Sequence, residues 1–217
     1  HYLQGRDDEG SISASLNDPL ANRSAGGSAG LYLLDNRVHF FAEGYLSALD
    51  TLNAGTSKDN AYKGGIDLRL NRFKLVAFYQ RLGYHYYSSG YPFLLNDRQG
   101  FKMNSAYFIP GITTVTMEAE QYEDNLSERP DETTTDTRSV DLGFTTHFGN
   151  LPELTLRWGY RDDYSNTLYD EDDNAIRTDR ISRKYEGRLG FNVIDNRFSL
   201  STIYMDLDDS SLIPGGA

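Results

Sequence analysis

The sequence predicts an all-β fold in which about ten strands run up and down in antiparallel order. Two observations support this prediction. Apolar and polar residues alternate along most of the chain, as they do in strands whose two faces meet different surroundings. The alternating segments also come in pairs, and a short turn joins the two members of each pair. We therefore expect a series of hairpins with one common architecture.

The clearest hairpin lies between Lys184 and Tyr204. Its two segments are separated by the tight turn Asp195-Asn196-Arg197, and both continue the same alternation. One face is apolar, with Tyr185, Gly187, Leu189, Phe191 and Val193 before the turn and Phe198, Leu200, Thr202 and Tyr204 after it. The other face is polar, so this hairpin is predicted to separate two different environments.

The other hairpins follow the same pattern. In chain order they occupy residues 27–49, 62–84, 101–119 and 140–160, with short turns at residues 35–36, 71–72, 110–111 and 149–153. We therefore divide the chain into residues 1–23, an N-terminal lead-in or short strand; residues 24–210, the hairpins; and residues 211–217, a loop-like C-terminal end.

The connections differ between the two ends of the hairpins. All the short turns lie at one end, whereas polar loops lie at the other, at Asp50–Asn60, Glu123–Asp136 and Asp162–Arg180. Short periplasmic turns, long outer loops and strands of ~9–11 residues are typical of barrels that cross a bilayer. The sequence therefore predicts an antiparallel up-and-down transmembrane β-barrel, whose strands either close on themselves or form part of a larger barrel.

The composition is compatible with strands in lipid. The chain has 16 tyrosines and 11 phenylalanines, and its mean hydropathy is only -0.59. A membrane barrel reads as polar on average, because only every second strand residue faces lipid. No apolar run approaches the ~20 residues that a membrane helix requires.

Charge and cysteine content exclude several function classes. The formal net charge of -11 comes with no basic stripe, so we expect no nucleic-acid partner. The absence of cysteine excludes disulfides, thiolate metal sites and cysteine nucleophiles. We expect no cofactor, no metal and no catalytic set, and we predict that the chain is not an enzyme.

The alternation assigns side chains to two surfaces. Charged residues opposite the apolar register are predicted to line a lumen: Glu43, Lys63, Asp67, Arg69, Arg81, Lys102, Glu118, Glu120, Asp141, Arg157, Arg161, Glu186 and Arg188. Apolar residues on the other face are predicted to contact lipid: Phe40, Leu46, Ile66, Leu68, Phe78, Leu142, Phe144, Leu156, Trp158, Leu189, Phe191 and Leu200. A lumen of this kind either conducts solutes or is plugged by its own ion pairs.

On this periodicity and loop asymmetry, residues 24–204 resemble the bacterial outer-membrane β-barrel, or porin-like, superfamily. The resemblance implies the outer membrane of a Gram-negative bacterium, lipid and lipopolysaccharide as neighbours, and passive passage of small solutes or ions. It leaves open a protein partner in the lumen or periplasm and assembly into a homo-oligomer. Such barrels usually end on a strand with a terminal aromatic, whereas residues 211–217 resemble a loop. We therefore expect a fragment of a larger barrel.

Two other interpretations remain open. The tyrosine- and arginine-rich stretch Leu156–Thr167 resembles in texture the large barrels that sheathe periplasmic multihaem cytochromes, which implies a structural role. In size the chain is similar to the omptin proteases, a resemblance that implies a hydrolase with an Asp-His couple at the extracellular rim. The best set for that reaction is His85 near Asp97, with Asp162 and Asp163 elsewhere in the sequence.

The histidines and one acidic loop are the candidate metal ligands in the sequence. His39, His85 and His147 each take the polar register without a partner at metal-ligand spacing, so we expect them to line the lumen. Residues 170–174 begin like an EF-hand loop, but Ala175 and Ile181 stand where the turn glycine and closing glutamate belong. A solvated acidic loop is the better interpretation.

Overall fold

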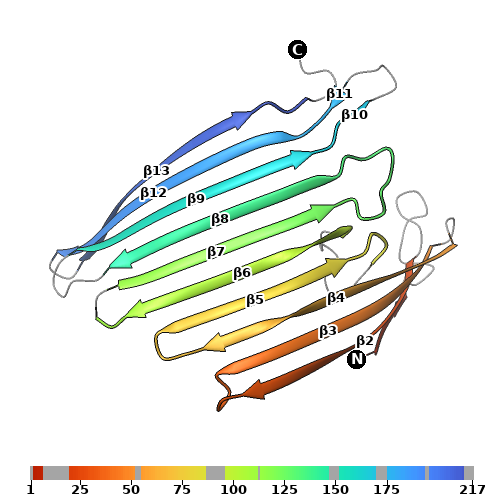
Figure 1. Cartoon of the computed structure of the whole chain (residues 1–217), viewed down its shortest axis with the longest axis horizontal. Coiled ribbons are helices and arrows are strands. Elements are labelled where there is room, and N and C mark those ends of the chain that lie inside the picture. The colour runs from red at the N-terminus through yellow and green to blue at the C-terminus, as the bar shows by residue number, and fades with distance from the viewer. Residues whose placement is uncertain are drawn as a thin grey trace.

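The computed structural model confirms an all-β, antiparallel, up-and-down sheet without helices in the described residues (Figure 1). The structure describes residues 2–6, 20–51, 55–86, 96–111, 113–146, 152–169, 175–193 and 196–212. Eleven strands form the main sheet, each hydrogen-bonded to its neighbours in chain order. Within the described ranges there is also no helix with the length and apolarity of a membrane span.

Ten strands of the main sheet are long, with 10 to 15 residues each. The sheet consists of β1 (Tyr2–Arg6), β2 (Leu20–Leu33), β3 (Val38–Thr51), β4 (Gly55–Arg69), β5 (Phe73–Leu82), β6 (Arg98–Ile109), β7 (Thr113–Asp124), β8 (Thr135–Thr146), β9 (Glu153–Ser165), β12 (Asp179–Val193) and β13 (Asn196–Asp209). Two short strands, β10 (Leu168–Tyr169) and β11 (Ala175–Ile176), pair separately within the connection between β9 and β12. The expected number of long strands is thus confirmed.

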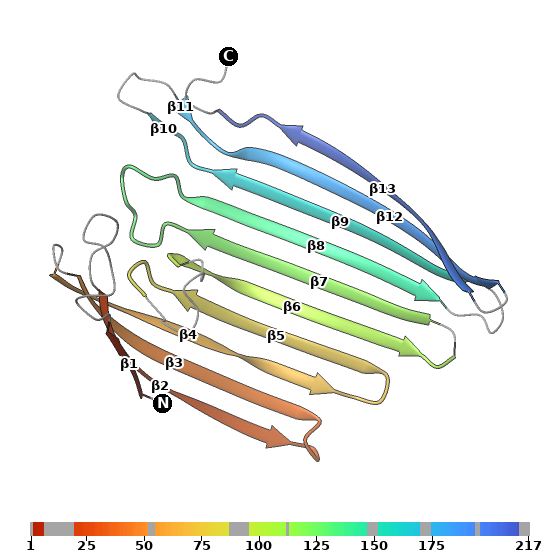
Figure 2. The ribbon, with the colours of Figure 1, turned by 180° about the vertical axis from the view of Figure 1, so that it is seen from behind.

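The sheet is open rather than closed. Among the described residues, β1 pairs only with β2 and β13 pairs only with β12, so these strands are the two edges (Figures 1 and 2). Because successive strands alternate in direction, β1 and β13 run the same way. The described residues therefore do not form a closed barrel.

The short turns lie together at one end of the sheet (Figure 1). Between β2 and β3, Leu34, Asp35 and Asn36 all have positive φ, at 51°, 54° and 64°. The turn is closed by a 3.1 Å hydrogen bond from the Arg37 N–H to the Leu34 carbonyl. Asp and Asn tolerate this left-handed conformation better than most residues, so the sequence favours a tight reversal here.

One predicted loop is wrong. Residues Asp50–Asn60 were expected to be a polar loop, but β3 continues to Thr51 and β4 begins at Gly55. The cross-strand pairing continues through the charged part of this hairpin, for example between Ala48 and Lys58. Polar side chains are therefore no sign of a strand end in this sheet. At the other boundary, β2 begins at Leu20, before the hairpin start expected at residue 24.

The cross-strand pairing is shifted in the same direction along the strands from one edge of the sheet to the other. Leu33, the last residue of β2, is connected by successive cross-strand pairs to Tyr204 of β13. Tyr204 lies eight residues beyond Asn196, where β13 begins. The turn ends of the strands are therefore staggered from one edge of the sheet to the other, as Figure 1 shows.

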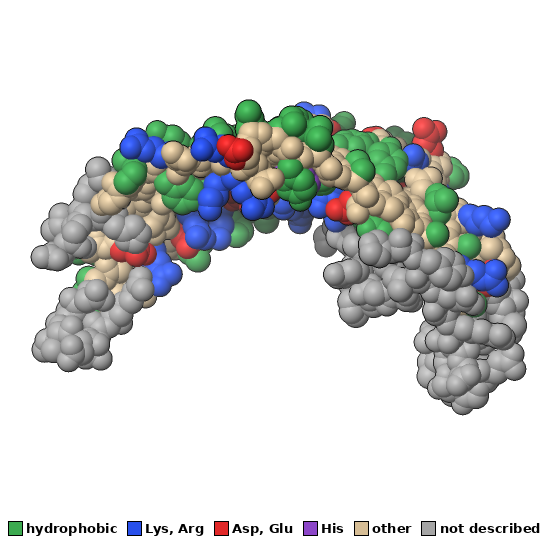
Figure 3. Space-filling view, turned by 90° about the horizontal axis from the view of Figure 1, so that it is seen from below, with side chains coloured by type: hydrophobic (Ala, Val, Ile, Leu, Met, Phe, Trp, Pro, Cys, Tyr) green, Lys and Arg blue, Asp and Glu red, His purple; other side chains and the backbone are tan. Residues whose placement is uncertain are grey.

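The sheet is curved into an arch. In Figure 3 hydrophobic side chains lie over the convex side, and Lys and Arg side chains gather on the concave side. Most of the buried strand residues share the concave face, among them Ser47, Ala61, Thr137, Thr155 and Asp163. Side chains converge on the inside of a bend, which explains why this face buries residues that are small or polar.

Glycines mark the same curvature. A Cβ added to the concave-face glycines Gly65, Gly100 or Gly143 would collide with the neighbouring strand. A Cβ added to the convex-face glycines Gly27 or Gly44 would meet nothing within 4 Å. Small residues are thus required on the inside of the bend and are optional on the outside.

Candidate functional site

The charged residues assigned to a lumen gather on the concave face. Since paired residues of neighbouring strands point to the same side of a sheet, the register places them. The concave face carries Glu43, Lys63, Asp67, Arg69, Lys102, Glu118, Glu120, Asp141, Arg157, Arg161, Glu186 and Arg188. The candidate site is therefore a charged, hollow surface contributed by strands β3 to β12.

Two assignments on β5 are wrong. The register places Arg81 on the convex face, paired with Tyr62 and Gln99, and it places Phe78 on the concave face, paired with Lys102. The cause is that β5 is apolar on both faces, so its alternation fits either register. On the concave face Phe78 has a role, because the Lys63 Nζ lies 4.1 Å from the centre of its ring.

The convex face carries the remaining residues that were assigned to lipid. The register places there Phe40, Leu46, Ile66, Leu68, Leu142, Phe144, Leu156, Trp158, Leu189, Phe191 and Leu200. Several are highly exposed: Leu46 is 66% exposed and Leu200 is 69% exposed. A contiguous, exposed apolar face of this kind indicates an interaction surface rather than a face for water.

The apolar surface ends in a polar rim at the loop end of the sheet. We call the apolar part the convex belt. On each strand it is followed, towards the loops, by a polar or charged residue of the same face: Arg23, Asp50, Asn60, Arg81, Gln99, Gln121, Arg138, Asp162, Arg183 and Asp206. Arg81 therefore belongs to this rim, although the sequence alternation had suggested the lumen.

An ion-pair cluster occupies the centre of the concave face. The Lys102 Nζ lies 2.6 Å from the Glu118 carboxylate and 3.1 Å from the Glu120 carboxylate. Glu118 is in turn the cross-strand partner of Asp141. This arrangement sets two carboxylates around a single ammonium, with a third carboxylate on the next strand, so the centre of the face carries a local excess of negative charge.

A hollow of about 560 Å³ adjoins this cluster. It is lined by Asn104, Ser105, Thr116, Met117, Glu118, Asp141, Leu142, Gly143 and Arg157. Gly143 opens it, because a Cβ at this position would collide with the Thr116 hydroxyl. Arg157 makes no ion pair with any side chain in the described part of the chain. The hollow therefore offers both signs of charge to a small hydrated solute.

A second cluster, near the loop end of the concave face, was missed from the sequence. Asp163 is only 3% exposed, and its carboxylate accepts hydrogen bonds from Arg161 at 2.9 Å, Arg180 at 2.9 Å and Thr137 at 2.7 Å. The Arg161 guanidinium also donates to the Tyr122 hydroxyl at 3.2 Å. In the sequence Asp163 follows Asp162, and only the register shows that the two point to opposite faces.

An aromatic group lies at the turn end of the concave face. The rings of Tyr32 and His39 stack with centroids 4.0 Å apart, and Phe41 follows His39 at 5.8 Å. His39 thus lies on the concave face, as expected from the polar register. His147 lies outside the described residues.

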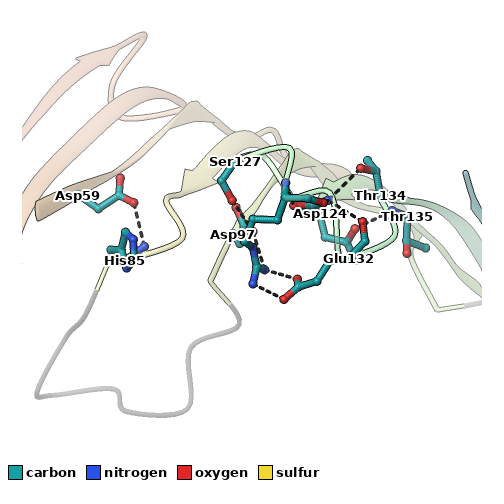
Figure 4. A network of polar contacts seen from close by, with 10 residues as sticks. Asp59, His85, Asp97, Asp124, Ser127, Glu132, Thr134 and Thr135 are labelled. Carbon is teal, nitrogen blue, oxygen red and sulfur yellow. Dashed lines mark hydrogen bonds and ion pairs between the residues drawn. The ribbon is translucent and has the colours of Figure 1, made fainter. Parts of the chain in front are cut away.

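At the loop end, a network of polar contacts joins two loops (Figure 4). The Arg129 guanidinium lies 3.2 Å from the carboxylate of the buried Asp97, pairs with Glu132, and stacks 3.9 Å from the centre of the Tyr84 ring. Burial opposes the charge of Arg129, but Glu132, Tyr84 and Asp97 outweigh it and raise the pKa of the guanidinium. Asn125 adds hydrogen bonds to the carbonyls of Arg129 and Glu132. We call these contacts the loop latch.

Replacing Arg129 with alanine is expected to open the loop latch. The variant loses the ion pairs and the cation–π contact, so local opening of residues 125–134 should become about fivefold more frequent. Limited proteolysis of the full chain in lipid vesicles measures this as faster cleavage in that loop. The control is Asp131→Asn, an exposed position in the same loop, and equal cleavage of both variants would contradict the latch.

The residues proposed for a hydrolase are not brought together. The backbone N–H of His85 donates to Asp59 at 2.9 Å, Asp97 is engaged by Arg129 and Ser127, and Asp163 is engaged by two arginines. Asp162 lies on the convex face. Over the described ranges, no three His, Asp or Glu side chains gather as metal ligands, and the acidic loop 170–174 lies outside those ranges.

No family model, curated protein or solved structure matches this chain in comparisons with known proteins. The functional argument therefore depends on the geometry of the two faces alone.

Proposed function

We propose that this chain forms the wall of an outer-membrane β-barrel of a Gram-negative bacterium, and that the barrel is a porin-like channel for small solutes or ions. The observation that carries the proposal is the separation of an exposed apolar convex belt from a charged concave face. A soluble sandwich would cover an apolar sheet face with a second sheet. Lipid serves that purpose for a single curved sheet.

The dimensions support a bilayer. In β3 the convex apolar positions extend from Val38 to Ala48, which is about 33 Å along the strand at ~3.3 Å per residue. On a tilted strand this length is comparable with the ~25 Å apolar band of outer-membrane barrels. The polar rim then lies at the level of the lipid headgroups, on the side of the loops.

The open sheet supports a wall rather than a complete barrel. Among the described residues β1 and β13 have no partner on their outer edges, and the backbone N–H and C=O groups there would be unsatisfied in lipid. Closing β13 directly onto β1 would require a parallel pair, whereas every other pair in the sheet is antiparallel. We therefore propose that additional strands complete the barrel around the concave face.

Conductance is the direct test. The chain together with the strands that complete its barrel, folded in detergent and added to planar bilayers, should give stepwise ion currents, because a charged concave face keeps water and ions in the lumen. The complete absence of conductance from a preparation that inserts into the bilayer would contradict the channel and leave the barrel wall standing.

Lys102→Met is expected to make the channel more selective for cations. The substitution leaves Glu118 and Glu120 without their shared ammonium, so the local potential becomes more negative. We expect the cation-to-anion permeability ratio to rise about two- to threefold, measured as a shift in reversal potential under a salt gradient. Arg138→Met, on the convex rim, removes the same charge from the opposite face and should leave the ratio unchanged. Equal shifts would contradict the assignment of the faces.

One observation favours a second candidate, a barrel that encloses a partner protein. On β13 three successive residues of the concave face are apolar, and these residues, Ile203, Met205 and Leu207, are 60%, 61% and 55% exposed. Such a strip suits contact with a protein in the concavity better than contact with water. Co-purification of a stoichiometric partner that is lost in Met205→Lys would support this candidate over an open channel.

A further inference from the structure

Two basic side chains stand together on the convex rim at the loop end of β2, β3 and β4. Arg23 is the cross-strand partner of Ala48, and Ala48 is the partner of Lys58. Both basic side chains are exposed. Since neighbouring strands are ~4.8 Å apart, their Cα atoms are about 10 Å apart with only an alanine between them. Long side chains at this spacing can converge on one anion.

Among the described residues these two charges have no ion-pair partner. Neither Arg23 nor Lys58 forms an ion pair or a side-chain hydrogen bond in the described part of the chain. Of the other basic residues of the convex rim, Arg138 lies 2.6 Å from Asp136 and Arg183 lies 3.1 Å from Asp206, whereas Arg81 is only partly exposed and also forms no ion pair among the described residues. In a chain of net charge -11, an unpaired basic couple favours an anion from outside.

The described carboxylates nearest to the couple contact neutral groups instead. Asp59 follows Lys58 in β4, but its side chain belongs to the concave face and accepts the His85 N–H. Asp50, on the same rim, accepts a hydrogen bond from the Thr56 hydroxyl. Neither carboxylate forms an ion pair with Arg23 or Lys58, so both basic side chains keep donors for a ligand.

The surface between the two charges is hollowed and apolar. A depression of about 350 Å³ is lined by Arg23, Ser24, Ala25, Leu46, Ser47, Ala48, Lys58, Asp59 and Asn60. The small residues Ala25 and Ala48 lower its floor, and Leu46, which is 66% exposed, continues it into the convex belt. Its two ends thus suit a charged group and a hydrocarbon chain, respectively.

We propose that this depression binds a lipid with a phosphomonoester headgroup. Arg23 and Lys58 donate hydrogen bonds to the phosphate oxygens, and the acyl chain lies along Ala25 and Leu46 towards the convex belt. A phosphomonoester carries close to two negative charges at neutral pH, which matches two basic side chains. The proposal rests on the proposed function, since it requires the convex belt to lie in lipid.

The test uses the full chain folded in zwitterionic micelles and titrated with phosphatidic acid, with bound lipid counted by native mass spectrometry. Arg23→Gln and Lys58→Gln should each weaken binding about fivefold, and the double variant about 25-fold. Arg138→Gln is the matched control, because it removes an exposed rim arginine that already has a carboxylate partner. Its affinity for phosphatidic acid should stay within about twofold of the original.

Three outcomes would overturn the site. These are unchanged binding in the double variant, equal weakening by Arg138→Gln, and equal affinity for phosphatidylcholine. If inorganic phosphate alone competes as strongly as phosphatidic acid, the depression is a phosphate site and the lipid assignment is wrong. Conductance in planar bilayers is measured on the same variants. A chain that conducts but fails these tests contradicts only the lipid site, whereas failure to enter bilayers contradicts the proposed function.

Discussion

Replacing Leu156 with arginine should destabilise the folded chain in lipid vesicles by about 2–4 kcal/mol. Leu156 is 47% exposed on the convex belt and pairs with Phe144 and Gly187, away from both the turns and the rim. An arginine at this depth must either lose hydration or distort the bilayer around it. Urea-induced unfolding from vesicles, followed by tryptophan fluorescence, measures the loss.

The matched control is the adjacent residue. Arg157 lies on the concave face beside the central hollow, so Arg157→Leu should change ion permeation while altering the free energy of unfolding by less than about 1 kcal/mol. If Leu156→Arg and Arg157→Leu destabilise the chain equally, the convex belt does not face lipid and the barrel wall is contradicted.

Replacing Gly100 with valine should destabilise the sheet by about 2–3 kcal/mol. A Cβ at Gly100 would collide with the Gln121 carbonyl and with the Tyr122 Cβ on β7. The obstacle is backbone and not the end of a flexible side chain, so the curvature between β6 and β7 must change to admit the new atoms. Unfolding from vesicles again measures the cost.

Replacing Gly44 with valine, in contrast, should not destabilise the sheet. Gly44 lies on the convex face, where an added Cβ meets nothing within 4 Å. Valine suits a strand and its side chain would lie in lipid, so we expect no loss and a gain of up to about 1 kcal/mol. If both variants are equally destabilised, crowding on the inside of the bend is not the reason for glycine there.

The hairpins could be predicted from the sequence because period-two alternation extends over many residues in most of the strands. The prediction failed on β5, where Val76 and Phe78 on one face are as apolar as Leu75 and Ala77 on the other. It also failed at Asp50–Asn60, because polarity at the loop end of a strand resembles polarity in a loop. A local sequence pattern does not show which residues of a neighbouring strand a residue pairs with. That pairing determines both which face a β5 residue lies on and where β3 and β4 end.

The polar clusters were less accessible to sequence reasoning. Lys102 could be assigned to the concave face, but its two glutamate partners come from β7 and depend on the cross-strand register. Asp163 gathers groups from β8, β9 and β12, and the loop latch joins segments on either side of β6 and β7. Contacts between such distant segments are set by the sheet topology, which single-sequence patterns describe only as alternation.

The climbing register has a consequence for the shape of the whole assembly. The cross-strand pairs that start at Leu33, at the turn end of β2, reach β13 at Tyr204, eight residues or about 26 Å beyond the turn end of that strand. The nine steps from β2 to β13 cover about 43 Å across the sheet at ~4.8 Å per step. The ratio corresponds to a strand tilt of about 30°, close to the ~35–45° found in closed barrels. A sheet with no such shear would roll up with its strands parallel to the axis. The sheet is thus already pitched as a barrel requires, and the additional strands that we propose would need only to continue the same stagger.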